Sequence, residues 1–133
     1  PKDNAIVARV IGNFRAGSVP GKLQYGSAWW FLDHRDGMTA QISALSNMGL
    51  LARFVGMVTD SRSFLSYSRH EYFRRILCNL LGEDVRRGLL PDDRGALGAL
   101  VEGICFFNAR AYFVFPLGDV AEGVERVAAV DRR

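Results

Sequence analysis

The sequence predicts an α/β fold with two parallel strands and flanking helices. One observation is the run 54 to 58, which is apolar or Gly without alternation, as in a strand that helices cover on both faces. Another is the stretch Leu23 to Ala28, a less hydrophobic strand pattern that follows a loop rich in Gly and Pro. Because a helical pattern separates them, we expect a right-handed crossover and parallel pairing, with the second strand running from Phe54 to Thr59.

Two helices are predicted in the first part of the chain. Asp3 is a candidate N-cap, and the helix after it is expected to bury one apolar face, formed by Ile6, Val7, Val10, Ile11 and Phe14. Asp33 or Asp36 can cap the next helix, and Gly49 is well placed to end it. The inward face of that helix is predicted to be Met38, Ile42, Leu45 and Met48.

Two further helices are predicted after residue 67. Ser68 and Glu71 have the spacing of a capping box, and Gly82 and Gly88 mark possible ends of the helix that it opens. The apolar face of that helix is Tyr72, Phe73, Ile76, Leu77, Leu80 and Leu81. Asp93 can cap a final helix with Leu97, Leu100, Val101, Ile104 and Cys105 inward. The pattern weakens after Phe113, so residues 114–133 form a tail that is either loose or partly helical.

Composition predicts one compact domain and argues against two classes of partner. The chain has 133 residues, 49% of them apolar, and a net charge of +3 from arginines spread along its length. A nucleic-acid-binding surface would have its arginines clustered on one face. The one candidate patch is Arg69, Arg74 and Arg75, and its aromatic neighbours fall on a predicted buried stripe, which argues against base stacking there. No apolar run approaches the ~20 residues of a membrane span, and no signal-peptide pattern begins the chain. Cys78 and Cys105 lie within apolar helical patterns, so a reducing cytoplasm is expected.

Asp60 and Arg62 are the candidate functional pair. Asp60 follows the buried run at the end of a predicted parallel strand, where α/β folds place ligands and reacting groups. Residues two apart in extended backbone leave on the same side, so both side chains could reach one small ligand. The structural alternative is that Asp60 caps a turn and forms a surface salt bridge with Arg62, and such a salt bridge would stabilise the fold by about 1 kcal/mol or less. Neither a His-x-His, a Walker loop, a G-x-S-x-G nor a dinucleotide fingerprint occurs.

Other candidates have two interpretations each. Trp29 and Trp30 follow the first predicted strand, where indoles either fill a core or form an apolar wall for a sugar. His34 is a loop histidine, more often found at a surface than on a metal. His70 falls in a first helical turn and is expected to be structural.

Long consecutive runs of the chain resemble the C-terminal part of uronate isomerase, also called glucuronate isomerase. The runs are Gly26 to Phe31, Asp36 to Met38, Gly49 to Leu51, Arg53 to Met57, Thr59 to Tyr67, Arg69 to Arg75 and Ile104 to Cys105. The resemblance extends to about Phe113, so residues 1–113 form the family-like part. It departs at Leu32 and His34, where Asn and Gln would be expected, and at Phe107, where Asn would be expected.

The resemblance implies a (β/α)8 TIM barrel of the metal-dependent amidohydrolase type. Such a barrel needs roughly 250 residues, so the chain is expected to be the last portion of a longer enzyme, carrying its final two strands and a helical C-terminal segment. The chain alone is therefore expected to be inactive. Its partners would be a hexuronate substrate and the remainder of the barrel or other protomers.

The resemblance also implies a reaction and residue roles. Uronate isomerases interconvert D-glucuronate with D-fructuronate, and D-galacturonate with D-tagaturonate, by proton transfer through an enediolate. Asp60 would bind a divalent metal, expected to be zinc, or contact the water bound to it, and would take part in proton transfer. Arg62 would bind the substrate anion. The histidine ligands would come from earlier strands. Alternatives are a non-catalytic structural or interaction domain and a nucleic-acid-binding module; the preferred uronate, the metal and the oligomeric state stay open.

Overall fold

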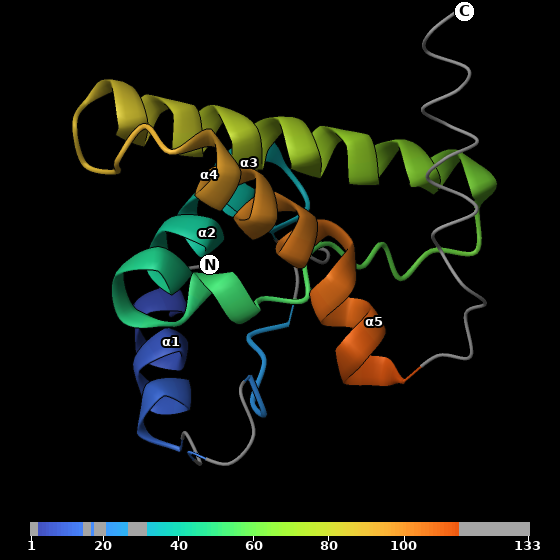
Figure 1. The fold of residues 1–133 in the computed structure, drawn as a ribbon. Coiled ribbons are helices and arrows are strands. Elements are labelled where there is room, and N and C mark those ends of the chain that lie inside the picture. Colours follow the sequence, from blue (N-terminus) through green and yellow to red (C-terminus); the bar gives the residue numbers. More distant parts are fainter. Residues whose placement is uncertain (1–2, 15–16, 18–20, 27–31, 115–133) are drawn as a thin grey trace, which may run out of the picture.

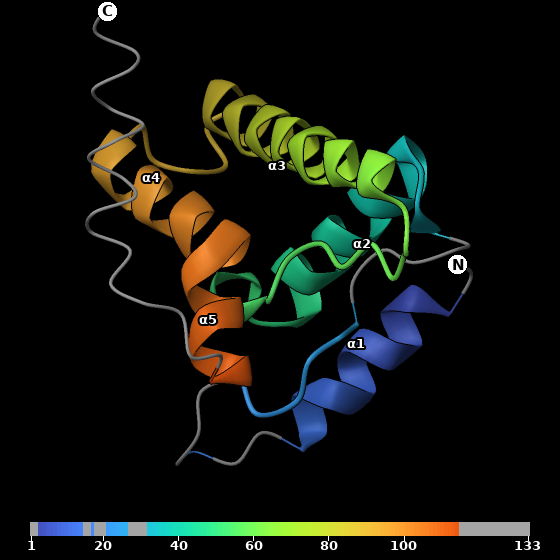
Figure 2. The ribbon, with the colours of Figure 1, turned by 90° about the vertical axis from the view of Figure 1, so that its right-hand side faces the viewer.

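Helices and helical turns are the regular structure of the described residues, which are 3–14, 17, 21–26 and 32–114 of this computed structural model (Figure 1). The α-helices are α1 (Asn4–Asn13), α2 (Arg35–Met48), α3 (Ser68–Arg86), α4 (Arg94–Glu102) and α5 (Asn108–Phe113). Two 3-10 turns, η2 (Leu51–Arg53) and η3 (Phe64–Tyr67), lie between α2 and α3, and a π-helical turn, η4 (Gly103–Phe107), joins α4 to α5. Figure 2 shows α3 crossing one end of the molecule, with α4, η4 and α5 forming a continuous column.

The predicted α/β fold is wrong for this part of the chain, because no β-strand occurs in the described residues. Residues 54 to 59 are buried at first but form no ladder, and residues 23 to 26 form none either; Ser27 and Ala28 lie outside the described residues. Two strands could pair only with each other, and an isolated two-stranded pair, with its outer edges unpaired, is at best marginally stable in water. Gly56 has φ +79° and Asp60 has φ +45°, so the backbone also turns twice. The expectation of a two-stranded barrel fragment is therefore overturned.

The apolar run 54 to 57 nevertheless lies in the core. The core combines residues of α2 and α3 with this run and one residue each of η2 and η4, namely Met38, Ile42, Leu45, Leu51, Phe54, Met57, Phe73, Ile76, Leu77, Leu81 and Ile104. Phe54 packs edge-on against Phe73 of α3, with 6.2 Å between ring centroids. The predicted burial of the run is confirmed for residues 54 to 57 but is wrong for Val58, which is exposed, and the predicted extended strand is wrong.

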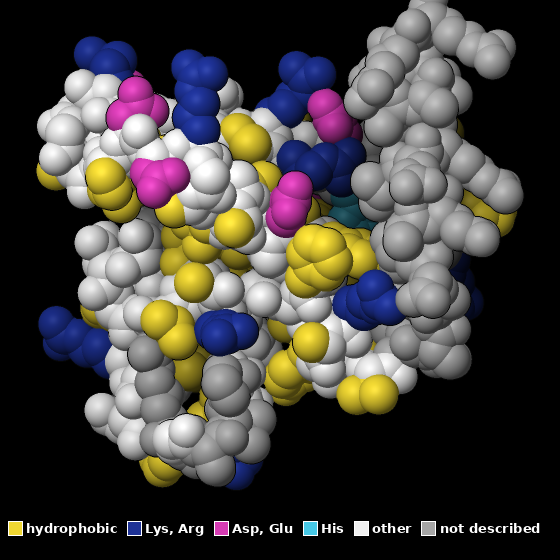
Figure 3. Space-filling view, viewed as in Figure 1, with side chains coloured by type: hydrophobic (Ala, Val, Ile, Leu, Met, Phe, Trp, Pro, Cys, Tyr) yellow, Lys and Arg dark blue, Asp and Glu magenta, His cyan; other side chains and the backbone are white. Residues whose placement is uncertain are grey.

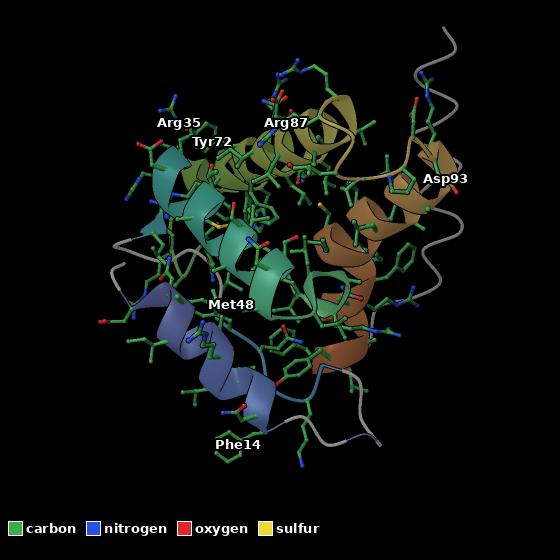
Figure 4. All side chains as sticks on the ribbon, turned by 90° about the vertical axis from the view of Figure 1, so that its left-hand side faces the viewer. Phe14, Arg35, Met48, Tyr72, Arg87 and Asp93 are labelled. Atoms are coloured by element: carbon green, nitrogen blue, oxygen red, sulfur yellow. The ribbon has the colours of Figure 1, made fainter. Side chains whose placement is uncertain are left out.

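Most of the apolar stripe predicted to anchor α1 is exposed, although Ile11 is half-buried. Ile6, Val10 and Phe14 are exposed, and Phe14 retains 66% of its accessible surface. The helix instead turns Asn4 and Ala8 toward α2 and buries them. Small side chains such as Ala8 allow the two helices to approach closely. Figure 4 shows Phe14 at the free end of α1, pointing away from the other helices.

Some predicted helix ends are confirmed and some are wrong. Asp93 caps α4 by accepting a hydrogen bond from Ala96 N at 3.0 Å. Gly49 ends α2, and Gly88, with φ +71°, follows the end of α3. Neither predicted aspartate caps α2, because His34 takes that position and its Nδ1 accepts from Gly37 N at 3.1 Å. No helix in the described part of the chain is long and apolar enough to cross a membrane.

The capping box predicted for α3 does not form. Ser63 accepts a hydrogen bond from Leu65 N and opens η3, so the helical path begins before Ser68. Ser68 Oγ donates to the carbonyl of Leu65 instead of accepting from Glu71. Of the predicted apolar face, Tyr72 is exposed and Leu80 is half-buried, while the others are buried.

Candidate functional site

The candidate site follows the buried run, at the point where the chain returns to solvent. Phe54, Val55 and Met57 are buried, whereas Val58 and Asp60 are exposed. Two side-chain amides hold the start of the run in place of a neighbouring strand. Asn108 of α5 donates from Nδ2 to the carbonyls of Ala52, at 2.9 Å, and Phe54, at 2.8 Å.

The second amide belongs to Gln24. Its Nε2 donates to Arg53 O at 2.8 Å and its Oε1 accepts from Val55 N at 3.3 Å. Gln24 therefore offers a donor and an acceptor to one backbone segment, as a strand neighbour would. Gln24 and Asn108 together, which we call the amide clamp, satisfy backbone groups of residues 52 to 55. Sequence analysis missed both residues, and the available signal was the polar Asn108 inside an apolar helical pattern.

Gly56 brings the run against the π-helical turn. A Cβ at this position would lie 2.4 Å from the carbonyl oxygen of Ile104, so a side chain has no room. The φ of +79° is also one that glycine adopts freely and other residues avoid. This close backbone contact fixes the segment that leads to Asp60.

Asp60 and Arg62 are both exposed on the loop after the run. Asp60 has φ +45°, a left-handed conformation that Asp tolerates better than most residues. They form no ion pair with each other, and neither has a hydrogen-bond or ion-pair partner among the described residues. Neither lines any of three cavities in the described part of the chain, which lie beside α1 and η2, beside α3 and α5, and between α2 and α3. Their functional roles therefore stay predictions.

Arg69 positions the backbone just before Asp60. Its Nη1 lies 2.6 Å from Asp33 Oδ2 and 3.3 Å from Thr59 O, to which it donates. This contact places the start of α3 beside the residue before the cap of α2. The sequence pattern placed Arg69 only in a basic patch, since nothing in the spacing links it to Asp33.

The basic patch is compensated by acidic side chains. Glu71 accepts from Arg74 at 2.9 Å and from Arg75 at 2.8 Å, and Arg69 pairs with Asp33. Hydrogen bonds from Arg74 and then Arg75 lower the pKa of Glu71. A phosphate backbone would have to compete with these carboxylates for each guanidinium, which weighs against the nucleic-acid alternative.

The described residues do not form a three-ligand metal centre. No group of three His, Cys, Asp or Glu side chains with suitable placement occurs among them. Asp60 offers a single carboxylate, whereas a catalytic zinc takes three protein ligands. His34 is engaged as the cap of α2, and the ring of His70 lies 6.5 Å from that of Tyr67. Trp29 and Trp30 lie outside the described residues.

Comparison with known proteins decides the family. The family model of glucuronate isomerase matches residues 1–113. The chain belongs to the glucuronate isomerase family. The chain is 64% identical to a uronate isomerase of Flavobacterium johnsoniae over 115 residues, which are 86% of this chain and 25% of that protein. It is also 64% identical to a uronate isomerase of Opitutus terrae over 113 residues, which are 85% of this chain and 24% of that protein. It is 59% identical to a uronate isomerase of Bacillus subtilis over 115 residues, which are 86% of this chain and 24% of that protein.

The chain spans about a quarter of the length of these glucuronate isomerase relatives. This agrees with the expectation that it corresponds to one portion of a longer enzyme. A shared length fixes the extent of the match and not its position, so placement at the C-terminal end stays a prediction.

Proposed function

We propose that this chain is part of an aldose–ketose isomerase that interconverts D-glucuronate and D-fructuronate, and D-galacturonate and D-tagaturonate. The observation that carries the proposal is the match of residues 1–113 to the glucuronate isomerase family. An exposed carboxylate and an exposed guanidinium, those of Asp60 and Arg62, two residues apart after a buried run, support it.

The reaction requires three things of its residues. A proton leaves C2 of the aldose, an enediolate forms, and a proton is delivered to C1, so the substrate and product are isomers. This needs a group that carries the proton, positive charge near the developing oxyanion, and a contact for the substrate carboxylate. We assign proton transfer to Asp60 and the substrate anion to Arg62, whose guanidinium can bind a carboxylate through two hydrogen bonds.

A divalent metal, zinc by expectation, belongs to the same proposal. Asp60 would contribute one carboxylate to it, and its other ligands would lie outside this chain. When bound, such an ion stabilises negative charge on substrate oxygens as a Lewis acid. Trp29 or Trp30 would supply an apolar wall for the sugar.

Partners and location complete the proposal. The substrate is a hexuronate, and the remainder of the enzyme or other protomers supply the missing part of the site. We place the enzyme in the reducing cytoplasm, which the two free cysteines support. A second candidate is a non-catalytic structural or interaction domain, which the exposure of Asp60 and Arg62 outside the three cavities considered above favours.

A chimera tests the function. The 115 matched residues of the Bacillus subtilis uronate isomerase are replaced by the matching part of this chain, and ketose formation from D-glucuronate is measured. We expect turnover, and a loss of at least ~100-fold in the Asp60→Asn chimera, the usual contribution of a positioned acid or base. Arg62→Lys should also lower turnover, because an ammonium group cannot form the bidentate contact. A folded chimera that turns over normally with Asn at position 60 would remove Asp60 from the mechanism.

A further inference from the structure

A small cavity lies beside α3, η4 and α5, apart from Asp60 and Arg62. Its volume is about 190 Å³. Its apolar lining includes Val55, Met57 and Phe106, and its polar lining includes His70, Arg74 and Arg110, with no Asp or Glu among the lining residues. Figure 3 shows Lys and Arg side chains beside an apolar patch in the region between α3 and α5.

The charges around this cavity are unbalanced. Arg110 of α5 is half-buried and has no hydrogen bond or ion pair with other described residues. Arg74 of α3 pairs with Glu71, but Glu71 is shared with Arg75, so one carboxylate serves two guanidinium groups. A partly buried guanidinium with no acceptor among the described residues is available to bind an anion in the cavity, through charged hydrogen bonds.

We propose that this cavity binds the carboxylate of a small organic acid. Arg110 and Arg74 contact the anion from two different helices, and the apolar lining covers the body of the acid. Water occupies about 30 Å³ per molecule in the liquid, so the cavity has the volume of roughly six waters, which suits a compact acid. Inorganic phosphate shares the anionic chemistry but has no apolar body. The proposal does not depend on isomerase activity.

The test uses the 133-residue chain and three probes. Benzoate binding is measured by calorimetry and compared with benzyl alcohol, its neutral counterpart, and with inorganic phosphate. We expect benzoate to bind and to weaken as KCl is raised, and benzyl alcohol to bind at least ~10-fold more weakly. Phosphate that binds as tightly as benzoate would overturn the assignment to an organic acid, and absence of benzoate binding would overturn the site.

Matched variants locate the binding. Arg74→Gln and Arg110→Gln should each weaken benzoate about 10-fold, the usual loss for one charged hydrogen bond. Arg75→Gln is the control, because Arg75 also pairs with Glu71 and carries the same charge but does not line the cavity. An equal loss in Arg75→Gln would mean that net charge alone decides binding, and would refute the site.

A protection experiment does not depend on variants that fold. Cys105 lines the cavity and Cys78 does not. Saturating benzoate should slow alkylation of Cys105 and leave the rate at Cys78 unchanged. Equal rates at Cys105 with and without benzoate would contradict the proposal.

Discussion

Arg69 Nη1 lies 2.6 Å from Asp33 Oδ2 and donates to the carbonyl of Thr59. The Asp33 side chain is 13% exposed and that of Arg69 40% exposed, so this pair is better shielded than the other ion pairs of the described residues. One guanidinium thereby joins the starts of two helices to the backbone that precedes Asp60.

Removing the charge of Asp33 should destabilise the chain. Asp33→Asn leaves the Arg69 guanidinium without its carboxylate in a partly shielded place, and we expect the free energy of unfolding to fall by about 1 to 2 kcal/mol. Urea unfolding followed by circular dichroism measures this. Glu83→Gln is the control, because its pair with Arg86 is solvent-exposed; a loss in Glu83→Gln as large as that in Asp33→Asn would show that shielding is irrelevant.

The amide clamp predicts a sharp effect of Asn108→Asp. This change replaces an N-H donor, shared by two carbonyls, with a carboxylate that repels both. Stability should fall by about 2 kcal/mol, the cost of unsatisfied and opposed polar groups. Asn79→Asp makes the same chemical change at an exposed position of α3, so a similar loss there would argue against the clamp.

Gly56→Ala should be severely destabilising, because φ is +79° and a Cβ would lie 2.4 Å from Ile104 O. We expect loss of about 3 kcal/mol or more, from backbone strain and displacement of η4. Gly82→Ala is the matched control: nothing lies within 4 Å of a Cβ there, and the helix should gain up to about 1 kcal/mol. Thermal unfolding of both variants measures these changes in stability. A Gly56→Ala chain as stable as the parent chain would disprove the close contact between Gly56 and Ile104.

The two cysteines should differ in reactivity with iodoacetamide. Cys78 is exposed, while burial raises the pKa of the Cys105 thiol, a shift that Arg74 opposes and Cys78 reinforces. The reactive thiolate of Cys105 therefore forms only at higher pH. Peptide mass spectrometry should find Cys78 modified first at pH 8. The rate of modification of Cys105 should rise once the pH exceeds 9.0, the ordinary pKa of a cysteine thiol. Faster labelling of Cys105 at pH 8 would contradict its burial.

The chain by itself should show no isomerase activity. It corresponds to a quarter of its relatives' length, and its described residues supply only one carboxylate toward a metal site. The assay mixes the purified chain with D-glucuronate and a divalent metal and measures ketose. Sustained turnover would show that the chain builds a complete site.

Local signals in the sequence predicted local features well. The caps at Asp93 and Gly49 and the burial of Met38, Ile42 and Phe73 follow from spacing alone. The Ser68 capping box failed because Ser63 starts the helical path earlier, and His34 was missed because imidazole is an unusual cap.

Features that depend on distant partners could not be predicted. A run such as 54 to 58 forms a strand only beside another strand, and here side-chain amides take that role. The face of α1 that is buried depends on what covers it, so Ile6 and Phe14 remain exposed in the described residues. The Asp33 to Arg69 pair joins residues far apart in sequence, which no spacing rule reaches. The roles of Asp60 and Arg62 come from the resemblance and not from the fold.

The π-helical turn sets the phase of everything that follows it. Asn108 N donates to Gly103 O, five residues back, so this turn holds one residue more than an α-helical turn would. Each residue of an α-helix advances the side-chain direction by about 100°. Because the wide turn closes with five residues where an α-helical turn closes with about four, deleting one residue between 103 and 107 would keep Asn108 on nearly the same side of the helix. Rewinding all five residues as regular α-helix would instead rotate α5 by about 100° and carry Asn108 away from the carbonyls of Ala52 and Phe54. The π-helical form of this turn, more than the identity of its residues, is therefore what aims Asn108 at these two carbonyls.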